Sequence, residues 1–286
     1  MRDDFLKRDF DLSDPDLASA LDELPLWSAP FGLMLLEIVP MRPAMAVLDI
    51  GCGSGFPILE LAQRLGGSSC LYGIDPWERG IERLILKACV FGLKNVTAVK
   101  GTAEQLPFGD GFFDLIVSNN GLNNIQDMEA VLAECSRTLR WEGRLVFTYN
   151  LAGTMSEFYA VLQETLAQSG KTHELTTIKA HIFDKRRPLS WVKRRLILAG
   201  FRDVRVHRRS FRLRYLDGSA MLRSFFIGQG FLEPWKNIVG PEDLARVFAR
   251  LEKNLNAAAR EKGELSLTIP MACLDCGKRP SKMSAF

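Results

Sequence analysis

The chain has 286 residues, of which 47% are hydrophobic and 25% are charged. This length and composition are enough to bury a large core, and they predict one sizeable globular domain with an elaboration. The formal net charge of +3 is too small to indicate nucleic-acid binding, which depends on a concentrated positive field. The chain opens on mixed acidic and basic residues, and its longest apolar stretch, 31–40, contains Glu37. These features exclude a secretion signal and a membrane span, so we expect a cytoplasmic protein.

The six cysteines are scattered rather than arranged as a disulfide framework, and we expect reduced thiols. Cys273 and Cys276 form one close pair, but a structural zinc site needs a second pair or suitably spaced histidines. The three histidines provide no such cluster, so we expect no metal and favour a strand end for the pair.

The N-terminal segment, 1–43, precedes the first predicted strand. It contains two apolar stretches, Leu21 to Trp27 and Phe31 to Val39. We expect it to form a helical lid over the carboxyl edge of the sheet.

From residue 46 the sequence alternates short apolar runs with amphipathic helical runs. This alternation predicts a parallel sheet covered by helices on both faces. Helix starts are indicated by Asp75, as an N-cap followed by proline, and by a capping box over 154–157. The predicted strands of this part are 46–50, 70–74, 96–100, 113–118 and 143–150.

Beyond about residue 170 the alternation breaks. A helix over 190–199 leads into a long strand-like run, 201–216, whose apolar phase shifts and predicts a bulge or bend near 208–210. Helices are predicted over 219–228 and 241–262, before a last strand at 265–274. A helical insert at about 218–262 therefore separates the last two strands.

The most informative motif is the run Val47 to Gly55, a buried strand that leads directly into Gly51-Cys52-Gly53-Ser54-Gly55. Glycines allow positive φ angles and close approach of a ligand to the backbone. A dinucleotide-binding fingerprint would have glycine or alanine where Phe56 stands, which counts against a pyrophosphate site. The next strand ends at Asp75, whose two oxygens match a ribose diol, although a helix N-cap would use the same oxygens.

Three further segments follow in order: Asp75 with Pro76 and Trp77, then Thr102-Ala103-Glu104 after the third strand, then Ser118-Asn119 at the end of the fourth. Together with the glycine run, they resemble the class I S-adenosylmethionine-dependent methyltransferases of the type 11 family. The resemblance covers about residues 46–150. It implies an α/β, Rossmann-like, seven-stranded and mostly parallel sheet, with a methyltransferase domain over 44–286.

The resemblance also implies a set of residues that bind S-adenosylmethionine. In that family the glycine loop packs against the amino acid part of the cofactor and the acidic residue faces its ammonium group. Thr102 stands where the family usually has an aspartate, and Trp77 is equally suited to the adenosine or to the core. The implied cofactor-binding residues are Asp49, Gly51, Gly53, Gly55, Asp75, Pro76, Trp77, Thr102, Ala103, Glu104, Ser118 and Asn119.

The methyl acceptor is less well defined. Ser118-Asn119-Asn120-Gly121 departs from the Asn-Pro-Pro-Tyr motif of enzymes that methylate exocyclic amines. The second half of the chain, including Phe147 to Asn150 and the 199–201 turn, has a fainter resemblance to the malonyl-acyl-carrier-protein O-methyltransferases of biotin synthesis, from which 121–125 departs. We therefore expect methylation at O or C of a small-molecule or carrier-bound acceptor. The alternatives are an RNA methyltransferase and a non-catalytic S-adenosylmethionine-binding protein.

Two further features bear on the acceptor. The basic segment 185–214 suits an acidic carrier protein, but we favour a solvated helix face and an edge strand protected by charge, and nucleic acid is disfavoured. Methyl transfer needs little acid–base help, because the sulfonium is already activated. If a catalytic base exists, the candidates are His173, His181 and Tyr149, each of which also suits an ordinary structural role.

Overall fold

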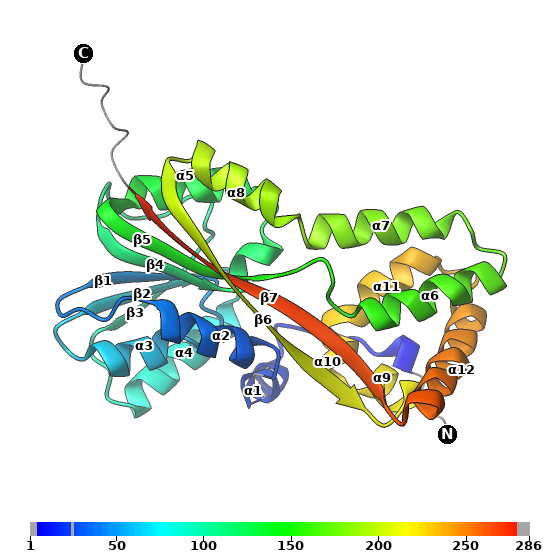
Figure 1. The fold of residues 1–286 in the computed structure, drawn as a ribbon. Coiled ribbons are helices and arrows are strands. Elements are labelled where there is room, and N and C mark those ends of the chain that lie inside the picture. The colour runs from blue at the N-terminus through cyan, green and yellow to red at the C-terminus, as the bar shows by residue number, and fades with distance from the viewer. Residues whose placement is uncertain (1–4, 24–25, 279–286) are drawn as a thin grey trace, which may run out of the picture. The chain divides into compact units, whose positions relative to one another are not determined.

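The computed structural model describes residues 5–23 and 26–278 (Figure 1). The chain divides into two compact units. The sheet unit comprises Asp11–Asn150, Pro188–Arg209 and Met271–Phe286, and the helical unit comprises Met1–Phe10, Leu151–Arg187 and Ser210–Pro270.

The described residues form a seven-stranded sheet in the order β3-β2-β1-β4-β5-β7-β6. Neighbouring strands from β3 to β5 pair in parallel, whereas β7 runs antiparallel to β5. This arrangement confirms the predicted Rossmann-like α/β fold. The strands are β1 Ala46–Ile50, β2 Cys70–Asp75, β3 Val96–Lys100, β4 Phe113–Asn119, β5 Leu139–Asn150, β6 Phe201–Tyr215 and β7 Leu265–Lys278.

Helices cover both faces of the parallel part of the sheet, with α2, α3 and α4 on one side and α5 and α8 on the other (Figure 1). Every residue of β4 is buried, as expected for a central parallel strand between two helical layers. The helices of the sheet unit are α1 Pro15–Glu23, α2 Ser28–Ile38, α3 Ile58–Leu65, α4 Glu78–Val90, α5 Met128–Thr138 and α8 Leu189–Leu198, with a short 3-10 turn at Gly121–Asn124.

The helical unit has its own core, in which the Trp235 ring stacks on Phe158 with centroids 3.8 Å apart. Its elements are α6 Ser156–Gln168, α7 Glu174–Lys185, α9 Gly218–Arg223, α10 Phe225–Ile227, α11 Glu233–Val239 and α12 Leu244–Lys262, with a 3-10 turn at Phe5–Lys7 and a π-helical turn at Gly228–Leu232. The long strands β6 and β7 pass from one unit to the other, at residues 209/210 and 270/271.

Several predicted boundaries are wrong. The helix expected over 219–228 is interrupted at Ser224, whose side chain caps α10 by accepting from the Ile227 amide (3.3 Å). Strand β5 begins at Leu139 rather than 143, with a register irregularity opposite Phe113/Leu115. In the apolar stretch 21–27, α1 ends at Glu23 and α2 begins after the stretch at Ser28, and residues 24–25 lie outside the described residues.

Both predicted helix caps are also wrong. The N-cap of α6 is Met155, which makes no side-chain cap, and Glu157 instead accepts hydrogen bonds from the Thr268 amide (3.0 Å) and hydroxyl (2.5 Å). The carboxylate therefore ties α6 to β7 because a strand amide lies within its reach. Helix α4 begins at Glu78, so Asp75 lies too early in the chain to cap it.

The predicted phase shift of β6 agrees with its burial. Half-buried residues fall at 204 and 206, then at 211, 213 and 215, and the intervening 207–210 are exposed. The change of phase coincides with the passage of the strand from the sheet unit to the helical unit.

None of the helices in the described ranges has the length and apolar character needed to cross a membrane.

Candidate functional site

The carboxyl ends of β1, β2 and β4 meet at one edge of the sheet. Asp49 pairs in register with Gly73 on one side and with Val117 on the other. The chain leaves β1 at Gly51, whose amide donates to the Ile74 carbonyl (2.9 Å) and keeps the glycine loop against β2. Ligands of open parallel sheets bind outside this edge, so the candidate residues here share one location.

The glycine loop requires its glycines. Gly51 has φ +72° and Gly53 has φ +48°, a region that side chains disfavour. A Cβ atom at Gly51 would lie 3.0 Å from Gly121 Cα, whereas one at Gly53 would meet nothing within 4 Å. The loop therefore packs against the end of β4 at Gly51 and has open space beside it at Gly53.

Asp49 is fully buried, and neither of its carboxylate oxygens has a hydrogen-bond partner among the described residues. Burial raises its pKa well above the ordinary 3.8, and the charge of Asp75 raises it further. The backbone amide of Ile58 opposes this rise. A buried carboxylate in this state is costly to ionise unless a positive group is bound beside it.

Asp75 organises the loop. Its Oδ2 accepts from the Gly53 amide (2.9 Å) and its Oδ1 from the Trp77 amide (2.8 Å). A carboxylate oxygen has two acceptor sites, so each oxygen still has one to offer a ligand hydroxyl.

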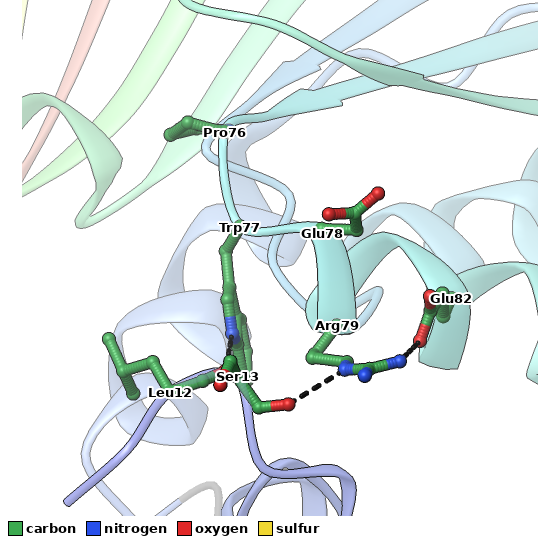
Figure 2. Close-up of a pocket in the computed structure, with 7 residues that line it drawn as sticks. All are labelled: Leu12, Ser13, Pro76, Trp77, Glu78, Arg79 and Glu82. Atoms are coloured by element: carbon green, nitrogen blue, oxygen red, sulfur yellow. Dashed lines mark hydrogen bonds and ion pairs between the residues drawn. The ribbon is translucent and has the colours of Figure 1, made fainter.

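Trp77 is held by the N-terminal segment. Figure 2 shows its indole Nε1 donating to the Leu12 carbonyl (2.9 Å), and Arg79 Nε donating to the Ser13 carbonyl (2.8 Å). These residues surround a shallow cavity of about 510 Å³ that Pro76 and Glu82 also line. The cavity lies directly after Asp75, at the place where the sequence predicts the adenosine.

A second anchor holds the same N-terminal segment. Asp22 forms ion pairs with Arg83 (3.1 Å) and Lys87 (2.5 Å) of α4. Burial raises the pKa of Asp22, but hydrogen bonds from Lys87, Ser54 and Arg83 outweigh burial and lower it overall. Since Ser54 belongs to the glycine loop, Asp22 joins α1, α4 and that loop.

The remaining predicted cofactor residues differ in exposure. Thr102 and Glu104 are exposed after β3, and Ala103 between them is buried. The hydroxyl of Ser118 donates to the Ile50 carbonyl (2.7 Å). Asn119 donates to the Ser28 carbonyl (3.0 Å) and accepts from the Thr148 hydroxyl (2.8 Å). The side chains of Ser118 and Asn119 thus bind other parts of the protein.

Asn120 is a residue that the sequence reasoning did not select. It is 8% exposed and adopts φ +63°, and its side-chain oxygen and nitrogen are buried with no hydrogen-bond partner in the described ranges 5–23 and 26–278. The sequence signal was the Asn-Asn-Gly run, because asparagine is the non-glycine residue that best tolerates this conformation. Together with Asp49, it gives this edge two buried polar side chains with unused hydrogen-bonding capacity.

The three candidates for a catalytic base lie in different surroundings. His173 is exposed before α7, and Tyr149 is buried in β5. His181 is half-buried in the helical unit, 3.1 Å from the Tyr159 hydroxyl. Burial lowers its pKa, and the charges of Arg186 and Lys185 lower it further.

Many arginines of the basic segment 185–214 already have partners. Ion pairs join Arg187 to Asp184, Arg195 to Glu129, Arg209 to Glu37 and Arg214 to Glu264.

Cys273 and Cys276 are buried free thiols in β7, and the described ranges contain no group of three metal-ligating side chains.

Comparison with known proteins agrees with this geometry. A family model described as a methyltransferase domain matches residues 41–194. The chain is 27% identical over 263 residues to the nocamycin O-methyltransferase of Saccharothrix syringae, an alignment that covers 88% of this chain and 92% of that protein. It is 30% identical over 149 residues to the aklanonic acid methyltransferase DauC of Streptomyces sp. (strain C5), covering 52% of this chain and 68% of that protein.

Among solved structures, the YcgJ protein from Bacillus subtilis has the same fold, with a TM-score of 0.58 and 19% identity over 88% of this chain and 99% of that one. Fold and site define a class I S-adenosylmethionine-dependent methyltransferase. The chain belongs to the methyltransferase domain family.

Proposed function

We propose that this methyltransferase acts on an oxygen or carbon of a small-molecule acceptor. The observation that carries the proposal is the extent of the match to nocamycin O-methyltransferase. The family model ends at residue 194, whereas that alignment covers 88% of the chain and therefore includes much of the helical unit. A helical unit like that of a small-molecule O-methyltransferase supports an acceptor of similar size.

The residues at the carboxyl edge fit S-adenosylmethionine. The cofactor supplies a methyl group already activated by the sulfonium. Asp49 would pair with the ammonium group, which matches a buried carboxylate that has no hydrogen-bond partner among the residues the structure describes. The free acceptor sites of Asp75 would receive the ribose hydroxyls, and the open side of Gly53 leaves room beside the loop backbone.

The other predicted cofactor residues would contribute in two ways. Pro76 and Trp77 would flank the adenosine, and Ala103 would meet it through its backbone. Ser118 and Asn119 would act by holding the ends of β1, β4 and β5 together, because their side chains already bind Ile50, Ser28 and Thr148. The N-terminal segment 11–43 would limit access to the cofactor through the Leu12 and Asp22 contacts.

A free small molecule is the preferred acceptor over a carrier-bound one. A carrier-binding surface needs arginines available to acidic residues of a partner, and several of those in 185–214 are engaged within the chain. Their arrangement supports protection of the exposed edge strand β6.

The test is methyl transfer from isotopically labelled S-adenosylmethionine to a panel of acceptors, read by mass spectrometry. The panel contains phenols, enolic dicarbonyl compounds, aromatic acids, acyl-carrier-protein thioesters and bulk RNA. We expect labelled product from a phenol, enol or acid. Label only in the thioester would support a carrier-bound acceptor, label only in RNA would refute the proposal, and cofactor binding without any transfer would support a non-catalytic role.

A further inference from the structure

The stretch 119–124 at the end of β4 contains four asparagines: Asn119, Asn120, Asn123 and Asn124. Asn119 uses both atoms of its side-chain amide inside the protein. The Asn123 side chain accepts from the Asn150 amide (3.1 Å) and donates to the Asn150 carbonyl (3.5 Å). Asn124 is exposed to solvent. Asn120 is therefore the member of the group that is left to be explained.

The Asn120 side chain has unused hydrogen-bonding capacity in a buried place. Its Oδ1 and Nδ2 have no hydrogen-bond partner among residues 5–23 and 26–278. Asn120 precedes the 3-10 turn Gly121–Asn124, but its side chain makes no hydrogen bond that caps this turn. Its backbone amide donates to the Thr148 hydroxyl (2.9 Å), so the backbone is held and the carboxamide is left over. Burying an unpaired carboxamide costs free energy that a bound ligand can recover.

Asn120 lies next to the glycine loop. Asp49 of β1 pairs in register with Val117 of β4, three residues before Asn120. A Cβ atom at the following residue, Gly121, would lie 3.3 Å from Gly51 Cα. The chain on both sides of Asn120 therefore runs along the end of β1. All of these residues belong to the sheet unit.

Asp49 and Asn120 offer different groups to a ligand at this edge. An ionised carboxylate only accepts hydrogen bonds, whereas a carboxamide has two N–H donors and an acceptor oxygen. The amino acid part of S-adenosylmethionine carries its ammonium and its carboxylate on the same carbon atom. If Asp49 binds the ammonium, the carboxylate needs a hydrogen-bond donor close to Asp49.

Asn120 is the side chain that can supply this donor. Within the described ranges, the buried side-chain nitrogens that lack a hydrogen-bond partner belong to Asn120, Arg186 and Arg195. Arg186 lies in the helical unit, and Arg195 belongs to α8 and forms an ion pair with Glu129 (2.6 Å). Of these three residues, only Asn120 directly follows a strand that ends at the cofactor edge.

We propose that Asn120 binds the carboxylate of S-adenosylmethionine through its Nδ2 donors. This inference rests on the proposed function, which assigns the ammonium to Asp49, and it adds the residue that recognises the other charged group. The two groups are then held from β1 and from the end of β4. Two fixed points on one carbon atom restrain the amino acid part more than either point alone.

The test compares, by calorimetry, the binding of S-adenosylmethionine with that of decarboxylated S-adenosylmethionine, which keeps the ammonium and lacks the carboxylate. Wild type should bind S-adenosylmethionine about tenfold or more tightly, a difference of about 1.4 kcal/mol. In Asn120→Gly, which suits the φ of +63°, this preference should disappear. In Asn120→Asp the added negative charge repels the carboxylate, so the decarboxylated molecule should bind more tightly.

Asn124→Gly and Asn124→Asp are the matched controls, because Asn124 is exposed in the same turn, and both should keep the wild-type preference. A merely structural role for Asn120 would weaken both molecules alike in Asn120→Gly, and this result would overturn the proposal. A preference that survives in Asn120→Gly, or no preference in wild type, would also overturn it. Unchanged cofactor binding in Asn120→Gly with a raised KM for an acceptor would assign the side chain to the acceptor instead.

The failure of this inference is distinguishable from that of the proposed function. A carboxylate preference retained in Asn120→Gly, with methyl transfer to a phenol, enol or acid by wild type, would refute the inference and leave the proposed function standing. Cofactor binding that depends on Asn120, without methyl transfer to any small molecule, would support the inference and refute the proposed function.

Discussion

Replacing Asp49 by asparagine should stabilise the protein without cofactor and weaken cofactor binding. Asparagine reproduces the shape of the protonated carboxyl and cannot ionise. The pKa of Asp49 is higher in the folded protein than its ordinary value of 3.8 in the unfolded chain. The protonated carboxyl therefore contributes stability that is fully present below pH 3.8 and is lost as the pH rises through the folded pKa. Over that window the wild type should lose about 1.4 kcal/mol of unfolding free energy per pH unit relative to Asp49→Asn.

The assay is urea denaturation of wild type and Asp49→Asn between about pH 5 and pH 8. We expect the variant to be more stable than wild type at the higher pH, with the difference shrinking toward the lower pH. Its affinity for S-adenosylmethionine should fall by about tenfold or more, because the ammonium loses a charged partner.

Asp114→Asn is the matched control. Asp114 is also buried in the sheet unit, but it forms an ion pair with Arg140 and accepts from the Ala46 amide (2.8 Å). Removing this compensated charge should destabilise the protein by about 1–2 kcal/mol and leave cofactor affinity unchanged. If Asp49→Asn is destabilised at every pH and binds the cofactor like wild type, the reasoning about Asp49 is refuted.

Three other variants test the remaining elements. Asp22→Asn should release the N-terminal segment, which is measured as faster proteolysis within residues 11–23. Lowering the pH through the depressed pKa of Asp22 should have the same effect on wild type. Equal cleavage rates in the variant and in wild type would contradict the anchoring role. Trp235→Ala should cost about 3–5 kcal/mol in urea denaturation, whereas Trp141→Ala, which is 61% exposed, should cost less than about 1 kcal/mol. Because the folded pKa of His181 lies below its ordinary 6.5, its neutral form supports stability above that value and the support is lost as pH falls. Wild type should therefore lose more stability than His181→Gln between about pH 7 and pH 5, and the exposed His207→Gln should follow wild type.

The parallel part of the fold was predictable because its signals are local. Strands β1 and β3 agree with the predicted 46–50 and 96–100, since each is a short apolar run between polar helices. The helix starts were less predictable, because a carboxylate in a capping sequence can bind a distant part of the chain instead of the helix start. Glu157 binds Thr268, more than a hundred residues away in the chain, and no local pattern reports that distance.

The site shows the same contrast. The glycine loop and Asp75 follow their strands directly, so their meeting at one edge follows from a parallel sheet. The partner-free state of Asp49 and the internal bonds of Ser118 depend on packing between strands. Arg186 is the clearest case, because in sequence it belongs to a basic run typical of a solvated surface, and only the fold shows that it is buried.

The most direct test of the central claim is calorimetric titration of the purified protein with S-adenosylmethionine, repeated for Asp75→Ala. Asp127→Ala is the control, because Asp127 also binds a backbone amide, that of Ala130 (2.9 Å), at the start of α5. We predict clear binding by wild type, a loss of about tenfold or more in Asp75→Ala, and an affinity within about twofold of wild type in the control. No binding by folded wild type, or equal affinities in wild type and Asp75→Ala, would contradict the assignment of this edge of the sheet as the cofactor site.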